Sequence, residues 1–172
     1  MRFILMFLIT VGAIVAAAIF LYYGPLAIGA ADACEPADLS ASAKWQTSDP
    51  LSGSIRFLNQ SGKACSLRGK PELRLQDAAT GSLNVSSSGG AAFGRTELAP
   101  GKTAAASVTW RNWCGAALNG PLYLMLRLPG SENEMLVPIV DAANRPVATF
   151  PACEDPNSAS SLEAGGFKTS VP

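Results

Sequence analysis

The amino-acid sequence predicts an all-β protein, an immunoglobulin-like antiparallel β-sandwich of about seven or eight strands, preceded by one N-terminal transmembrane helix or signal segment. Apolar and polar residues alternate with a period of two along short segments, and clusters of Gly, Pro, Asn and Asp separate these segments. An unbroken apolar run occupies the N-terminus. We therefore expect a signal or anchor segment over residues 1–33, a sandwich over 34–153 and a polar tail over 154–172.

The apolar run is the first element. Residues 3–31 carry no charge, and residues 3–23 are long and apolar enough to cross the hydrocarbon layer as a helix. Arg2 precedes the run, and Tyr22 and Tyr23 close it. This pattern predicts a single-pass anchor with its N-terminus inside, an aromatic belt and an exported C-terminal body.

A cleaved signal peptide is the alternative interpretation, because Ala31, Asp32 and Ala33 form a small-residue cleavage site. The apolar run is longer than the usual signal core, which favours a retained anchor. A lipoprotein cut before Cys34 would want a leucine-like residue in place of Ala31. Under every alternative the body is extracytoplasmic, either membrane-anchored or secreted.

Alternation of period two marks the strands expected in the body, because one face of each strand is buried. In residues 39–45, Leu39, Ala43 and Trp45 alternate with serine and lysine. The other predicted strands are residues 54–59, 72–76, 103–110, 122–128, 137–139 and 147–150. Val147 and Phe150 form the apolar positions of the last one.

Turn residues separate these strands at 59–63, 77–81, 100–101, 129–131 and 141–145. Two stretches lie outside the scheme. Residues 86–92 are rich in serine and glycine, which predicts a mobile loop. Residues 154–172 are polar, with little to bury, which predicts a tail.

Four cysteines, Cys34, Cys65, Cys114 and Cys153, follow the apolar run at wide spacing and without a C-x-x-C pair. In an exported chain this pattern predicts two disulfides rather than a metal or redox site. Three pairings are open. If residues 39–45 and 54–59 pair in antiparallel fashion, Cys34 and Cys65 lie at the same end, which favours Cys34–Cys65 and leaves Cys114–Cys153 by elimination.

Several short stretches resemble a known family. They are Cys34, residues 59–71 (NQSGKACSLRGKP), 98–103 (LAPGKT) and 108–114 (VTWRNWC), and Cys153. Together they resemble the bacterial domain of unknown function 4232, from about residue 34 to about residue 153. An aromatic residue often stands in that family where this chain has Lys70. The resemblance implies an extracytoplasmic all-β sandwich behind a signal or anchor, with no assigned role and no catalytic residues to transfer.

Composition excludes several function classes. The chain has 13 Lys and Arg against 13 Asp and Glu, so no net charge draws it to nucleic acid. It has no histidine, which excludes Ser/His/Asp and Cys/His catalysis and metal sites that need imidazole. We expect no enzyme, no cofactor and no bound metal.

One possible binding loop stands out: Trp110, Arg111, Asn112 and Trp113, directly before Cys114. Exposed aromatic and arginine side chains on a rigid loop are typical of binding sites. The alternative, which the sequence favours, is that Trp110 belongs to the core and Trp113 covers the disulfide. Glu132, Glu134 and Asp141 are weaker candidates for calcium, since no EF-hand loop is present.

These observations predict a non-catalytic cell-envelope protein that contacts the membrane through its N-terminal segment and binds an unknown envelope protein or glycan. A structural module without a discrete ligand is the alternative, and a carboxylate-dependent glycoside hydrolase is a weaker one. Convergent exposed aromatics would favour binding, and an evenly polar surface would favour the structural role. Two facing buried carboxylates would favour hydrolysis.

Overall fold

The computed structural model describes residues 31–46, 50–78 and 81–169. This part of the chain is all-β, with eleven strands and one short 3-10 helix, η1 (Pro36–Asp38). The predicted anchor or signal segment lies outside the described residues. Within them, no helix is long and apolar enough to cross a membrane. The strands belong to one compact unit, Ala31–Pro172.

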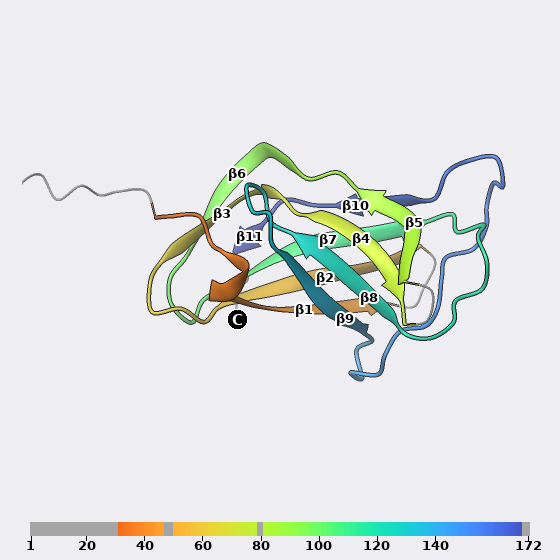
Figure 1. Ribbon diagram of the computed structural model, residues 1–172, viewed down its shortest axis with the longest axis horizontal. Coiled ribbons are helices and arrows are strands. Elements are labelled where there is room, and N and C mark those ends of the chain that lie inside the picture. Colours follow the sequence, from red (N-terminus) through yellow and green to blue (C-terminus); the bar gives the residue numbers. More distant parts are fainter. Residues whose placement is uncertain (1–30, 47–49, 79–80, 170–172) are drawn as a thin grey trace, which may run out of the picture. The chain divides into compact units, whose positions relative to one another are not determined.

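The strands are β1 (Leu39–Gln46), β2 (Leu51–Asn59), β3 (Cys65–Lys70), β4 (Glu72–Asp77), β5 (Gly81–Ser87), β6 (Gly90–Leu98), β7 (Thr103–Arg111), β8 (Leu122–Arg127), β9 (Glu134–Val140), β10 (Ser161–Ala164) and β11 (Lys168–Thr169). Nine of them form one sheet in the order β10-β7-β2-β1-β9-β8-β4-β5, with β11 also paired to β7, while β3 pairs with β6. Strands β10 and β5, at the two ends of this order, lie next to each other, so the sheet curls into a nearly closed, barrel-like sandwich (Figure 1).

Alternate side chains of these strands fill the core. In β2, Ile55 and Phe57 are buried while Arg56 between them is exposed. Strands β1, β4, β7 and β8 alternate in the same way, as predicted. Each large apolar side chain buried in this way stabilises the fold by about 1.5–3 kcal/mol, so the alternation accounts for most of the driving force.

The predicted disulfide pairing is confirmed. Strands β1 and β2 are antiparallel, with Leu39 opposite Asn59, so Cys34 and Cys65 lie at the same end and are joined with 4.9 Å between their Cα atoms. Cys114 and Cys153 form the second disulfide, with a Cα separation of 4.8 Å. Two disulfides indicate that the body resides in an oxidising compartment.

The prediction of a loop over residues 86–92 is wrong. Ser87 ends β5 and Gly90 begins β6, so strands occupy most of this stretch. The hydroxyl of Ser87 accepts a hydrogen bond from the Leu73 N–H at 3.2 Å, near a register shift between β4 and β5. A serine that satisfies the neighbouring backbone supports a strand despite its low intrinsic preference, which composition alone did not reveal.

The prediction of a polar tail over residues 154–172 is also wrong. Strands β10 and β11 pair with β7, and Leu162 and Phe167 are buried. The ring of Phe167 packs edge-on against Phe57, with 5.3 Å between centroids. Because each of these short edge strands has few residues, it carries little periodic signal. The sandwich therefore extends through residue 169.

The predicted strand at 147–150 is not formed. Val147 is buried, and its backbone still bonds to neighbours: its N–H donates to Ile139 at 3.0 Å and its carbonyl accepts from Leu122 at 2.7 Å. Phe150 is 44% exposed instead of facing the core. Apolar composition predicts a strand here, but within 147–150 only Val147 has these backbone bonds, which is too few for a strand.

Candidate functional site

Trp110, the last residue but one of β7, lies inside the core. Its side chain is fully buried, and its indole N–H donates to the hydroxyl of Ser160 at 2.8 Å. Its ring makes edge contacts with Trp45 and Trp113, at centroid distances of 6.4 and 5.6 Å. A buried indole whose donor is already bonded contributes to packing. The core interpretation of Trp110 is confirmed.

Asn112 is a clamp for the chain that leads to β10. It is 8% exposed and has a φ of 57°, in the left-handed region that Asn tolerates. Its side-chain oxygen accepts from the N–H groups of Glu154 and Asp155, both at 2.9 Å. Its side-chain nitrogen donates to the carbonyls of Asp155 and Ser158, also at 2.9 Å. These four bonds occupy the amide inside the protein.

Trp113 and Arg111 are the members of the predicted loop that reach the surface. Trp113 is half-buried, and its indole N–H donates to the carbonyl of Ala116 at 2.9 Å. Its ring lies against Gly115, where a Cβ would come within 2.4 Å of it. Arg111 is exposed. The structure thus does not gather the four predicted side chains into one site.

Two of the three acidic side chains considered for calcium are held in ion pairs, and the third, Glu132, is exposed. Glu134 pairs with Arg74, and Asp141 pairs with Arg145 at 2.8 Å. The backbone N–H of Arg145 is the main cause that lowers the pKa of Asp141. No three His, Cys, Asp or Glu side chains of the described chain gather as metal ligands. Asp77 is its one buried carboxylate, and it accepts from the N–H of Asn119 at 3.0 Å.

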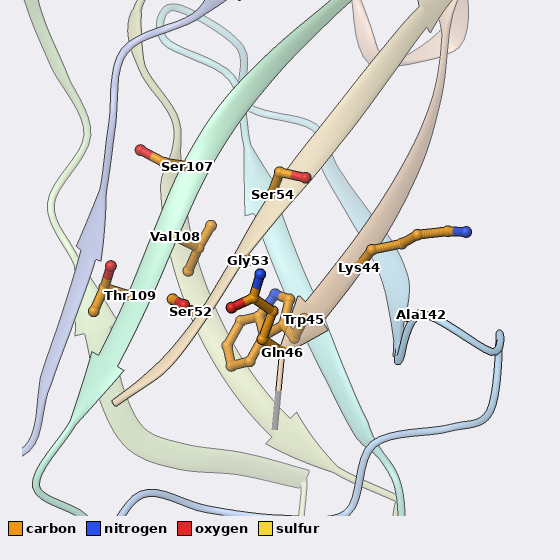
Figure 2. A pocket seen from close by; sticks show the side chains of 10 residues that line it. All are labelled: Lys44, Trp45, Gln46, Ser52, Gly53, Ser54, Ser107, Val108, Thr109 and Ala142. Carbon is orange, nitrogen blue, oxygen red and sulfur yellow. The ribbon is translucent and has the colours of Figure 1, made fainter. Parts of the chain in front are cut away.

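A groove of about 470 Å³ lies on the outward face of β1, β2 and β7 (Figure 2). The strand register lines its side chains up in two rows across the sheet: Lys44, Ser54 and Ser107, and Gln46, Ser52 and Thr109. Among the described residues, no carboxylate lines the groove. The groove therefore offers hydroxyls, one amide and one cation to a ligand.

Gly53 forms the floor of this groove, opposite Trp45 of β1. A Cβ at Gly53 would lie 2.4 Å from the Lys44 carbonyl and 2.5 Å from the indole of Trp45. The glycine therefore lets the indole pack against the β2 backbone, a known means of stabilising a glycine within a sheet. The indole N–H of Trp45 is buried and has no hydrogen-bond partner among the described residues.

Sequence reasoning missed the groove. Alternation identified Lys44, Ser54 and Ser107 as outward positions, but it does not tell which outward residues of different strands stand in line. The lone glycine inside a strand was the available signal, because such a glycine often marks a close approach of another group.

Comparison with known proteins gives one match. The model of the family described as Domain of unknown function (DUF4232) matches residues 34–156. No curated protein and no solved structure matches the chain. The match covers the first nine strands and both disulfides, which confirms the resemblance carried by the cysteines and the Leu-x-Pro-Gly step. The chain belongs to the DUF4232 family.

Proposed function

We propose that the protein is a non-catalytic binding module of the cell envelope that holds an envelope glycan in the groove over β1, β2 and β7. The single observation that carries this proposal is the alignment of Lys44, Ser54 and Ser107 in one row of that groove. Serine hydroxyls both donate and accept hydrogen bonds, and Lys44 donates three, which suits the hydroxyl and carboxylate groups of a sugar polymer.

The electrostatics of the groove support an anionic or hydroxyl-rich ligand. The side chain of Lys44 is exposed and makes no ion pair or hydrogen bond within the described residues. Because no acidic side chain among the described residues lines the groove, the charge of Lys44 is available to a ligand. The floor belongs to paired strands, so binding needs little ordering of the protein.

Location and topology support the same role. The apolar residues 3–23 would anchor the body outside the membrane or direct its secretion, and the two disulfides suit that compartment. Strand β1 lies between the β2-β7 and β4-β8-β9 neighbours, an order that supports the immunoglobulin-like sandwich that we propose. Such sandwiches present rigid surfaces for recognition.

A structural module without a ligand is the second candidate. It is favoured by the burial of Trp45 and Trp110, which leaves Trp113 as the indole nearest the surface. Glycan sites commonly use exposed aromatic faces, whereas Trp45, the one aromatic residue among the described residues that line the groove, is buried.

Cosedimentation of the full-length chain with purified insoluble cell-wall polymer separates these candidates. We expect the wild-type chain to pellet with the polymer and Lys44→Gln to bind several-fold more weakly, in line with the loss of one exposed charge contact. Lys63→Gln, which removes the same charge from the β2–β3 turn, is the matched control and should bind normally. Absence of wild-type binding would support the structural role, and release of soluble sugar would contradict the non-catalytic assignment.

A further inference from the structure

The outward face of β8 and β9 differs from the rest of the sheet. Its side chains are Tyr123 and Met125 on β8 and Leu136 and Pro138 on β9, whereas β1 and β2 expose mainly serine, lysine and arginine. Leu136 is 54% exposed and is one of the two large hydrophobic side chains exposed in the described chain. Apolar side chains that gather on a solvent face mark an interaction surface.

Charged residues border this apolar face on one side. Arg127 pairs with Glu72, and Arg74 pairs with Glu134. The face thus has an apolar centre and a rim with equal numbers of arginines and glutamates. An apolar centre with a polar, arginine-containing rim is the usual composition of a protein interface.

Packing face on face is the contact that these strands favour. Strand β8 is hydrogen-bonded to β4 and β9, and β9 is hydrogen-bonded to β8 and β1 (Figure 1). Strand β8 has no free edge, whereas β9 pairs with β1 only through Ile139 and Val140. Pro138, in the remaining part of β9, has no N–H to offer to an added strand. Two sheets pack well through such faces when their strands are nearly aligned.

We propose that the partner is a second copy of this chain, related by a two-fold axis. The axis lies between the two packed faces and runs parallel to the strands, above the line between β8 and β9. The strand register makes the face self-complementary under this operation. Met125 lies opposite Leu136 in the ladder, Tyr123 opposite Pro138 and Arg127 opposite Glu134. Rotation about this axis brings each residue of one copy face to face with the residue of the second copy that is its partner in the ladder. Met125 of one copy, for example, then faces Leu136 of the other.

Both the apolar and the charged contacts agree with this arrangement. Met125 of each copy meets Leu136 of the other at the centre, and Tyr123 meets Pro138. Arg127 of each copy meets Glu134 of the other, so opposite charges face each other twice at the rim. The groove begins at β1, where Lys44 lies opposite Val140 of β9, so it borders the apolar face. The dimer does not depend on what the groove binds.

Charge exchange tests the proposal. The full-length chain is produced with two different affinity tags and solubilised in mild detergent, and co-purification of the two forms reports self-association. We expect wild-type copies to co-purify. Arg127→Glu and Glu134→Arg should each lose association about tenfold or more, because each places two like-charged contacts in the dimer. A mixture of the two variants should recover it, since Glu at 127 of one chain then faces Arg at 134 of the other.

The mixture also controls for folding, because mixing cannot repair a misfolded chain. Leu136→Lys should abolish association, and Phe150→Lys, at the other exposed large hydrophobic position, should leave it unchanged. Wild-type chains that fail to co-purify would overturn the proposal. Association that survives Leu136→Lys, or charge variants that the mixture does not restore, would overturn it as well.

Discussion

Replacement of Asn112 by alanine is the sharpest test of how the C-terminal strands are held. The amide of Asn112 makes four hydrogen bonds to the backbone of residues 154–158, directly before β10. Strands β10 and β11 bury Leu162 and Phe167 against the core. Loss of the clamp should therefore reach beyond the loop itself.

The magnitude follows from the structure. Each of the four bonds contributes about 0.5–1.5 kcal/mol net, and loss of a partner leaves backbone groups to be satisfied by water. The left-handed backbone at Asn112 adds about 1 kcal/mol for alanine. We expect Asn112→Ala to lower the free energy of unfolding by about 4 kcal/mol, which corresponds to a fall in Tm of about 10 °C.

Chemical denaturation and thermal unfolding of the full-length, disulfide-bonded chain measure this loss. Asn144 is a matched control, because it also has a positive φ, of 60°, but is exposed and makes no side-chain hydrogen bond to the described residues. Asn144→Ala should cost about 1 kcal/mol, the backbone contribution alone. Hydrogen exchange should show early loss of protection in β10 of the Asn112 variant. Equal stabilities of the two variants would refute the reasoning.

Three further results are expected. Trp110→Ala should lower the free energy of unfolding by about 3–5 kcal/mol, because its side chain is fully buried. Trp113→Ala, at a half-buried site, should lower it by clearly less. Equal denaturation midpoints for the two variants would contradict the core position of Trp110. Mild reductant should open the exposed Cys114–Cys153 bond before the buried Cys34–Cys65 bond, because the reductant reaches exposed sulfurs first. Alkylation of the freed thiols followed by mass spectrometry gives the order, and the reverse order would disprove this expectation. Hydrogen bonds from the Ser158 hydroxyl and the Asn157 N–H lower the pKa of Asp155 in the folded protein. The stability that this carboxylate contributes is therefore present above its unfolded pKa and is lost as pH falls through the lower folded pKa. In a plot of Tm against pH, Asp155→Asn should make the fall of Tm at acid pH less steep; an unchanged fall would contradict this role.

Local pattern predicted much of the fold. The alternation in residues 39–45 and 122–128 correctly gave buried faces, and the antiparallel pairing of the first two strands correctly gave the Cys34–Cys65 bond. Strand β3 was missed because Cys65, Ser66 and Leu67 are all buried, which removes the alternation. There the Ser66 hydroxyl donates to the carbonyls of Ala31 and Asp32 at 3.1 and 3.2 Å, so a polar side chain is satisfied inside.

The candidate sites were less accessible to sequence reasoning. The aromatic and amide residues near Cys114 were noticed, but Trp110 and Asn112 serve packing and the C-terminal clamp. The groove and the face of β8 and β9 depend on which residues stand opposite one another across strands. Lys44 and Ser107, for example, are in line only because β2 lies between their strands.

The sequence by itself determined the all-β class, the disulfide-rich character and the inward and outward faces of most strands, because these depend on residue type and on spacing along one strand. The tertiary structure alone decided that β10 and β11 complete the sandwich, that the hydroxyls around Lys44 form rows and that Met125 stands beside Leu136. Strand order and register join residues far apart in the chain. Such pairings are fixed by packing of the whole core, and no single segment carries them.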